Sequence, residues 1–400
     1  MHSQRISFLF PFLLVSYEIV TYLSNDMYLP ALPTIGRDFN ITKDMVQYTL
    51  LFWFLGSSSM QLVMGPLSDR YGRRVVLLTG GVFYIIASFI CAITDNIYIM
   101  LINRFIQGVT VCSVVVSGYS AIHELYDSKS AIKILAIMGS VTILAPALGP
   151  LMGAIVLQVA HWRVIFYLLG FGAIITVGLL WKVMPETNPI RIPLNMKDIL
   201  RDYASIAMHK EFWGYTLPFC LLFMAFICWL VQSPFIVEDF YHRSSLTYGT
   251  LQCIIFGGFL IGAQMTQRLI YRFTLLSVIN FGMLIALGSA VLLLITNYFF
   301  ENHIVLVVAA MTILSLGTAI TFSPLNRLAI EACSEPMGRR MAVFSSAMGF
   351  FGVLGTVLVA FFNEAQMSGL SWLIIGSVVC AFLIFYFSKK NGIITAKPIE

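Results

Sequence analysis

The feature that most constrains this chain is the recurrence of apolar segments, each about 20 residues long, along nearly its whole length. A helix rises 1.5 Å per residue, so about 20 residues cross the roughly 30 Å of hydrocarbon in a bilayer. Hydrophobic residues make up 59% of the chain and charged residues 11%, with a mean hydropathy of +0.88. Soluble globular chains are about 25% charged, so this composition excludes a soluble fold.

Twelve such segments are expected to form transmembrane helices. The predicted fold class is an all-α membrane protein with two six-helix bundles, a plan that places a substrate site between the bundles near the midplane. The expected helices lie at residues 7–30, 45–66, 75–94, 98–124, 132–157, 163–183, 212–237, 247–269, 275–297, 303–327, 341–362 and 369–388.

The longest gap between apolar segments divides the chain into two halves. It contains three prolines and ends in a polar stretch over 196–210 with helical spacing, which predicts a short amphipathic helix on the membrane surface. The expected parts are an N-terminal bundle (1–183), a cytoplasmic linker (184–211), a C-terminal bundle (212–388) and a cytoplasmic tail (389–400).

The positions of Lys and Arg predict the orientation, because positive residues in short loops are retained on the cytoplasmic side. With the amino terminus inside, the loops expected outside contain only Arg37, Lys43, Arg163 and Arg243. Both termini are then cytoplasmic. The net charge of +5 arises in these short loops and not on an amphipathic face, so the expected partner is the lipid bilayer and not nucleic acid.

Motifs for enzymatic chemistry are absent from the sequence. The seven cysteines form no CxxC pair or His/Cys cluster with ligand spacing, and neither GxSxG nor HExxH occurs. The adjacent His123 and Glu124 are the nearest candidate for a catalytic pair, and a pair at a helix end is the favoured interpretation. We therefore expect no metal, no cofactor and no enzymatic activity.

Three ionisable residues, Glu18, Asp26 and Arg104, fall well inside the expected helices, and Glu124 lies at the inner end of the fourth. A charged side chain at the bilayer centre costs about 2.5–3.5 kcal/mol on insertion scales, so such residues are expected to face a cavity and to act there. Asp26 lies about 12 Å further along the first helix than Glu18 and is rotated by about 80°.

Both carboxyls can face one central cavity, with Tyr22 and Asn25 between and beside them. A low dielectric favours the protonated carboxyl, and a nearby cation favours the ionised form, so each group can hold either a proton or a cationic partner. The alternative is that one carboxylate only pairs with Arg104 and locks the bundle.

The strongest local motif runs from Gly65 to Arg74. Gly65 is expected to allow close helix contact and Gly72 to make the turn, while Asp69 accepts hydrogen bonds from a helix amino end. Arg70, Arg73 and Arg74 would pair with acids across the cytoplasmic face and form a conformational latch. The alternative is a simple topology anchor, which explains the arginines but not Asp69 or the glycines.

Two further patterns lie on the fourth and fifth helices. Arg104 and Gln107 share one face, with Gly108 next to Gln107. On the fifth helix, proline and glycine residues predict a bent helix with a small face that another helix can approach closely, unless they mark only a generic kink. This predicted hinge consists of Pro146, Gly149, Pro150 and Gly153.

The decapeptide 65–74 and the patterns on the fourth and fifth helices together resemble the signature motifs of twelve-helix drug:H⁺ antiporters of the major facilitator superfamily. Further matches, among them Tyr17-Glu18 and Asn25-Asp26-Met27, extend the resemblance over essentially the whole chain. The resemblance implies a monomeric pump in a bacterial inner membrane that exchanges protons for lipophilic cationic, zwitterionic or neutral drugs.

The resemblance also assigns residues to roles. It implies proton coupling by Glu18, Asp26, Arg104 and Glu124. The substrate-binding residues that it implies are Tyr22, Asn25, Asp26, Met138, Thr142, Phe226, Ile227 and Phe350. Alternating access of one central site would couple the two fluxes. The alternatives are a dedicated proton-coupled exporter of one metabolite, such as a siderophore or a sugar, and a membrane protein that does not transport.

Overall fold

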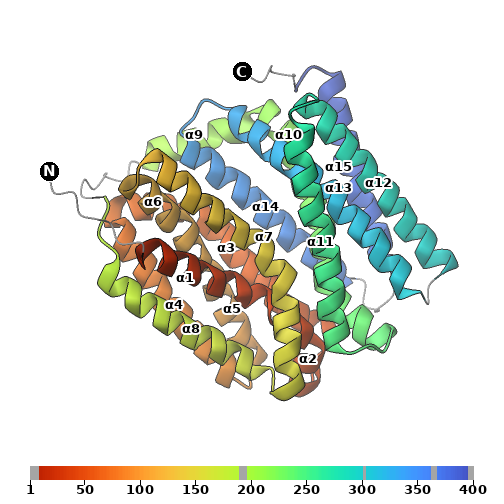
Figure 1. Ribbon diagram of the computed structural model, residues 1–400, viewed down its shortest axis with the longest axis horizontal. Coiled ribbons are helices and arrows are strands. Elements are labelled where there is room, and N and C mark those ends of the chain that lie inside the picture. Colours follow the sequence, from red (N-terminus) through yellow and green to blue (C-terminus); the bar gives the residue numbers. More distant parts are fainter. Residues whose placement is uncertain (1–8, 189–195, 301–302, 362–366, 395–400) are drawn as a thin grey trace.

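The computed structural model describes residues 9–188, 196–300, 303–361 and 367–394, and helices occupy almost all of these (Figure 1). The N-terminal half contains α1 (Leu9–Asp26), η1 (Leu29–Ala31), α2 (Leu32–Phe39), α3 (Lys43–Tyr71), α4 (Arg73–Ile93), α5 (Ile97–Ser113), η2 (Val114–Gly118), α6 (Tyr119–Leu125), α7 (Ser128–Val159) and α8 (Arg163–Val183). After α9 (Met196–Met208), the C-terminal half contains α10 (Lys210–Phe235), η3 (Ile236–Phe240), α11 (Ser245–Leu269), α12 (Leu275–Phe299), α13 (Ile304–Glu331), α14 (Met337–Phe361) and α15 (Met367–Lys390).

The helices are long and apolar enough to cross a membrane, which confirms the predicted fold class. Among the described residues, 10 continuous helices meet this condition, and the bent helix α7 raises the number to 11. Helix α1, whose 18 residues include Glu18, Asn25 and Asp26, does not meet this condition, and it is the remaining one of the twelve predicted spans. The chain is therefore a multi-pass membrane protein.

The first span ends earlier than predicted. Helix α1 stops at Asp26, and the chain then turns through η1 into the short helix α2, each of which has a proline in its first turn. Because proline disfavours a helical conformation in the residue before it and suits the first turn of a new helix, Pro30 and Pro33 divide this segment. Asp26 thus lies at a helix end and not in the middle of a long span.

Two predicted helices contain a π turn. The fourth span consists of α5, the π turn η2 and α6, and the seventh span ends in the π turn η3. Such turns hold one extra residue and often occur at functional sites. Because of this extra residue, the side chains after a π turn point in directions that differ from those predicted by the periodicity of a regular α-helix.

Helix α7 bends by 41° between its segments Lys129–Gly139 and Leu144–Val159. The bend lies just before Pro146, whose ring clashes with the carbonyl of the residue four positions earlier in a straight helix. The glycines after the bend have the predicted close helix contact. A Cβ at Gly149 would lie 2.6 Å from the Cβ of Asp26, and one at Gly153 would overlap the backbone of Met27.

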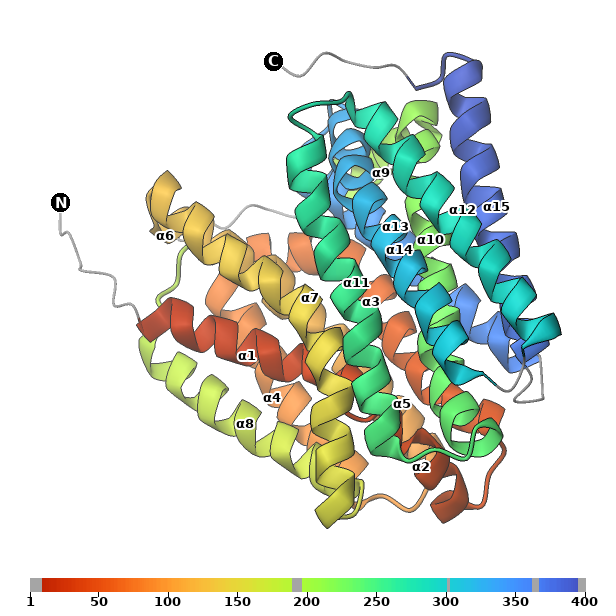
Figure 2. The same cartoon turned by 45° about the vertical axis from the view of Figure 1, so that its right-hand side comes forward.

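The two halves pack against each other through α3 with α14 and α7 with α11. Figure 2 shows α7 and α11 side by side at their lower ends and diverging toward the top. At the close end, Gly249 of α11 lies against Leu151 of α7, and the Cys253 thiol donates to the carbonyl of Ala147. Helices α7 and α11 therefore meet mainly toward one side of the membrane (Figure 2), whereas α3 and α14 also touch near their middles, where Gly349 lies against Ser58.

Helix α9, within the stretch predicted as a surface helix, contacts both halves. Tyr203 donates its hydroxyl to the carbonyl of Leu62 on α3 at 2.8 Å. Asp202 forms an ion pair with Arg339 of α14. The linker therefore ties α3 to α14 on the side where α3 ends.

Close packing of α3 against α5 provides a test of the fold. A Cβ at Gly108 would overlap the carbonyl oxygen of Trp53, whereas a Cβ at Gly288 of α12 has no heavy atom of the described residues within 4 Å. We expect Gly108→Ala to cost about 1–3 kcal/mol through overpacking and to lower Tm in detergent. Gly288→Ala is the control and should leave Tm unchanged or raise it slightly. Equal Tm values for the two variants would contradict this packing.

Candidate functional site

The two carboxyls of α1 are both enclosed by protein. Glu18 has no exposed surface, and Asp26 retains 2%. Helix α1 packs against α5, η2, α7 and α8, and its buried residues include both acids. Both groups therefore lie inside the N-terminal bundle and do not face lipid.

Glu18 has one hydrogen-bond donor among the described residues. The Tyr119 hydroxyl, on the first residue of α6, donates to Glu18 Oε1 at 3.1 Å. Glu18 Oε2 is buried and has no hydrogen-bond partner in the described part of the chain. Because an unpaired buried polar atom is costly, Oε2 is the atom where a proton or a ligand donor would be most strongly stabilised.

Asp26 accepts a hydrogen bond from the side-chain amide of Asn25 at 3.3 Å. Its other close neighbour is the glycine face of α7, where Gly149 lets the α7 backbone approach the Asp26 side chain. Asn25 is itself 6% exposed, and its Oδ1 has no partner among the described atoms. Asp26 is thus held at the junction of α1 and α7, just beyond the bend of α7.

Arg104 is fully buried and binds the backbone of α1, not a carboxylate. Its Nη1 donates to the carbonyl of Ser24 and to Gln107 Oε1, both at 2.8 Å, and its guanidinium lies 4.3 Å from the ring centre of Tyr28. Within the described residues, no ion pair joins Arg104 to Asp26 or Glu18. This conformation therefore does not contain the alternative arrangement, in which a carboxylate of α1 pairs with Arg104 and locks the bundle.

The hydrogen bonds of Arg104 continue into α4. Gln107 Nε2 donates to the Ser88 hydroxyl at 2.9 Å, and Ser88 donates to the carbonyl of Tyr84. The shared face of Arg104 and Gln107 therefore connects the end of α1 to α4. This network sets the position of the backbone two residues before Asp26.

The remaining expected pocket residues have different environments. Tyr22 is half-buried, and Phe226 packs edge-on against Phe256 with ring centres 5.0 Å apart. Ile227 and Met138 are enclosed in apolar clusters, Met138 within the N-terminal bundle. The side chain of Thr142 lies outside the described residues.

Phe350 differs from the other expected pocket residues in its exposure. Its side chain is 60% exposed, on the face of α14 that Val357 and Phe361 also share, and Phe361 is 78% exposed. Phe351, the next residue, packs against the apolar core instead. Sequence alone could not choose between two adjacent phenylalanines, because either helix face can be apolar in a membrane protein.

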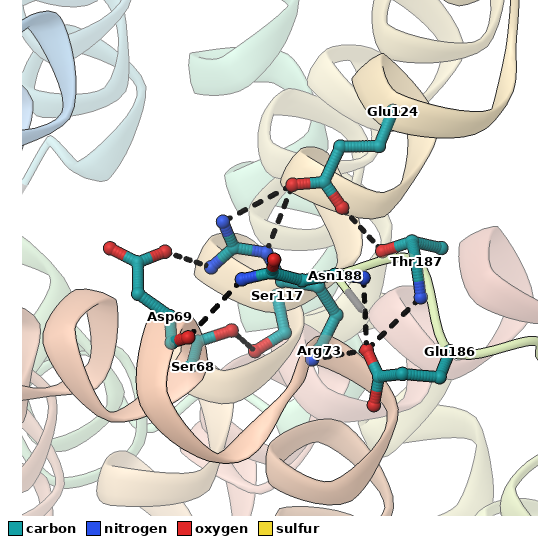
Figure 3. A network of polar contacts seen from close by, with 8 residues as sticks. All are labelled: Ser68, Asp69, Arg73, Ser117, Glu124, Glu186, Thr187 and Asn188. Carbon is teal, nitrogen blue, oxygen red and sulfur yellow. Dashed lines mark hydrogen bonds and ion pairs between the residues drawn. The ribbon is translucent and has the colours of Figure 1, made fainter. Parts of the chain in front are cut away.

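A polar network surrounds Arg73 at the ends of α3 and α4 (Figure 3). Arg73 Nη1 pairs with Asp69 at 2.6 Å, its Nε and Nη2 donate to Glu124 Oε1 at 3.2 Å, and its backbone N–H donates to Glu186 Oε1 at 2.9 Å. The Thr187 hydroxyl donates to Glu124 Oε2. We call this set the Arg73 network: Ser68, Asp69, Arg73, Ser117, Glu124, Glu186, Thr187 and Asn188.

The Arg73 network joins the N-terminal bundle to the linker and places Glu124 outside the central site. Glu124 is held by an arginine and a threonine at the end of α6, so the structure separates it from Glu18 and Asp26. In the sequence these acids form one group, because all three lie in or at the end of a span. Only the folded structure, in which Glu124 reaches Arg73 at the α3–α4 turn, distinguishes their surroundings.

The glycines of the same motif behave differently from each other. Gly72 has φ of 102°, which favours glycine, and a Cβ there would overlap the Glu186 carboxylate. The expected close helix contact at Gly65 is wrong, since no described heavy atom lies within 4 Å of a Cβ built there. Close contact on α3 occurs instead at Gly56, where a Cβ would overlap the Phe105 carbonyl.

The two other arginines of the motif have different partners. Arg74 donates to the Trp181 carbonyl at 2.6 Å, and the Arg70 guanidinium lies 5.3 Å from the ring centre of Tyr71.

Charge pairs between the halves lie on the opposite side, which is expected to face outward. Arg37 pairs with Glu238 at 3.0 Å, and Lys43 pairs with Asp239 at 2.9 Å. Nearby, Gln47 of α3 donates to Gln232 of α10 at 2.6 Å. From the sequence, the two bases were expected only as topology signals. The adjacent acids Glu238 and Asp239, at another outer helix end, are the sequence feature that could have predicted these pairs.

These observations define a multi-pass membrane protein with two helix bundles and buried ionisable groups in the first. A family model of the Major Facilitator Superfamily matches residues 14–356. The chain belongs to this superfamily.

Curated relatives agree with this assignment. The chain is 30% identical over 355 residues to the chloramphenicol resistance protein CraA of Acinetobacter baumannii, covering 88% of this chain and 86% of that protein. It is 32% identical over 375 residues to the multidrug transporter MdfA of Escherichia coli O157:H7, covering 91% and 88%. It is 31% identical over 359 residues to MdfA of Yersinia pestis strain Angola, covering 88% and 85%.

Solved structures show the same fold. A bacterial homologue of the human lysosomal transporter Spinster, in an inward-facing and unoccupied conformation, has a TM-score of 0.75 at 14% identity and covers 98% of both chains. A D-xylose–proton symporter has a TM-score of 0.74 at 15% identity, covering 95% of this chain and 98% of that one.

The charge pairs between the halves can be tested by reversal. Glu238→Arg should repel Arg37 and open this side, raising the maleimide labelling rate of Ser233→Cys, a buried α10 position, about fivefold in a background without natural cysteines. The double change Arg37→Glu with Glu238→Arg should restore slow labelling. Fast labelling in the double variant, or no change in the single one, would show that this pair does not hold the halves together.

Proposed function

We propose that this protein expels lipophilic drugs from the cell in exchange for protons. The observation that carries the proposal is the burial of Glu18 and Asp26 on α1 without an ion pair among the described residues. Relatives over most of the chain are named as a multidrug transporter and a chloramphenicol resistance protein. Protons and drugs then compete for one polar site in a low dielectric.

The chemistry of the competition follows from the two protonation states. A buried carboxylate is stabilised by a bound cation, and a buried neutral carboxyl needs none. Protonation from the outside thus weakens the hold on a cationic drug, and deprotonation toward the cytoplasm restores it. For a neutral drug, the proton changes the hydrogen bonding and charge of the site instead.

The two halves rock around this site in the proposed cycle. The pairs Arg37–Glu238 and Lys43–Asp239 close the side expected to be outer, while α7 and α11 diverge toward the other (Figure 2). Opening outward requires these pairs to break and the inner ends to approach. Pro146 and the glycines of α7 supply the hinge next to Asp26, and the Arg73 network strengthens the inner side.

Position in the cell is part of the proposal. The bacterial relatives support a bacterial inner membrane, and the uneven distribution of Lys and Arg supports a cytoplasmic position for both chain ends. One chain contains both bundles, so a monomer suffices for transport. Tyr22, Asn25, Phe226 and Ile227 are the proposed substrate contacts.

Replacement of the two acids tests the coupling. In detergent, adding tetraphenylphosphonium, a lipophilic cation, to the protonated protein should release protons only if drug and proton compete. We expect Asp26→Asn or Glu18→Gln to reduce this release at least severalfold while the protein remains folded. If both single variants and the double variant released protons as the natural protein does, the proposed coupling would be wrong.

Substrate charge provides a second test. One proton moving through about 100 mV supplies about 2.3 kcal/mol, enough for roughly a fiftyfold gradient. Exchange of one proton for a monovalent cation moves no net charge, so collapsing the voltage alone should slow chloramphenicol efflux but leave tetraphenylphosphonium efflux unchanged. Equal slowing of both in inverted vesicles would contradict a one-proton exchange, and failure to protect cells against several unrelated drugs would favour a dedicated metabolite exporter.

A further inference from the structure

The fourth span is interrupted at the level of Glu18. Between α5 and α6, the π turn η2 packs against α1, so that a Cβ at Gly118 would lie 2.9 Å from Leu14. The Ser117 hydroxyl shares a hydrogen bond of 2.8 Å with Ser68 of α3, and both serines are fully buried. The extra residue of this turn is thus held between α1 and α3.

Tyr119 follows directly after this turn and points at Glu18. Its hydroxyl supplies the hydrogen bond to Glu18 Oε1, while Oε2 stays unpaired within the described residues. A π turn displaces the residues after it by about one position around the helix. A continuous α-helix from Ile97 would therefore direct Tyr119 elsewhere.

The other end of α6 is also fixed. Helix α6 has only seven residues, about 10 Å in length, and Glu124 near its end is bonded to Arg73 and Thr187. Tyr119 is therefore carried by a short helix that is anchored at both ends. The position of its hydroxyl does not depend on the flexibility of a loop.

Among the described residues around Glu18, Tyr119 is the one whose side chain donates a hydrogen bond to the Glu18 carboxyl. Tyr22 on α1 lies near Glu18, Asp26 and Cys112 of α5, and Tyr119 lies near both Glu18 and Tyr22. Apart from Tyr17, whose hydroxyl has no hydrogen-bond partner among the described residues, the other titratable groups of the neighbouring helices lie toward helix ends or are bound elsewhere, as Arg104 is to Ser24. These groups are Tyr17 on α1, Arg104 on α5, His123 and Glu124 on α6, Lys129 and Lys133 on α7, and Arg163, Tyr167 and Lys182 on α8.

We propose that Tyr119 is a positioning residue that orients the Glu18 carboxyl and stabilises its ionised form, so that the proton exchanged during transport is taken up at Oε2. The proposal rests on the proposed function, because it refines how one of the two coupling acids works. Tyr119 keeps its own proton throughout. It donates a hydrogen bond to Oε1, and no bond is made or broken at the phenol.

Tyr119→Phe tests this role, because it removes the hydroxyl and keeps the ring. Without the donor, the ionised carboxyl loses a hydrogen bond, so release of the Glu18 proton needs a higher pH. We expect the pH profile of proton release induced by tetraphenylphosphonium to move upward by about one pH unit. Tyr17→Phe is the matched control, since the Tyr17 hydroxyl is fully buried and has no partner among the described residues, and its profile should not move.

A Glu18→Gln background separates this inference from the proposed function. There, Tyr119→Phe should leave the profile where Glu18→Gln alone puts it. If Glu18→Gln leaves the pH profile of the natural protein unchanged, Glu18 is not a coupling acid, and the proposed proton coupling by Glu18 is wrong. If Glu18→Gln changes the pH profile but Tyr119→Phe does not, the positioning role of Tyr119 is refuted, while the coupling role of Glu18 stands. The same conclusion follows if Tyr17→Phe shifts the profile as much as Tyr119→Phe does.

Discussion

The arrangement of this protein depends on the cost of enclosing two carboxyls in an apolar bundle. Glu18 and Asp26 lie on one helix, have almost no exposed surface and have no cationic partner within ion-pair distance among the described residues. Such groups are stable only when a proton, a hydrogen-bond donor or a bound cation compensates them. Tyr119 and Asn25 supply single donors, and this incomplete compensation leaves room for a proton or a substrate.

Small residues make this enclosure possible. Gly149 and Gly153 let α7 reach the end of α1, and Gly56 and Gly108 let α3 reach α5. In lipid, helices associate through packing and hydrogen bonds and not through a hydrophobic driving force, so the backbone must approach closely. The same contacts that stabilise the N-terminal bundle therefore determine what Asp26 can touch. Charge pairs at one side and the Arg73 network at the other then connect the bundle to its surroundings.

Much of the fold was predictable because hydropathy is a property of segments. The transmembrane helices, the polar stretch that forms α9 and the turn at Gly72 could be predicted from residue types and spacing. The separation of Glu124 from Glu18, the exposure of Phe350 and the open space at Gly65 could not. In a membrane protein, apolar residues occur on every helix face, so periodicity does not tell which face meets a neighbouring helix.

By itself, the sequence determined that this chain spans a membrane many times and carries acidic groups inside its first span, since only a helix satisfies its backbone in lipid and ionisable residues there are rare. Tertiary structure alone decided that Tyr119 meets Glu18, that Arg104 binds the backbone at Ser24 and that Arg37 pairs with Glu238. The physical reason is that these partners are 80 to 201 residues apart in sequence. Their meeting depends on the π turns, the bend of α7 and close glycine contacts, each of which changes side-chain directions without changing the hydropathy pattern.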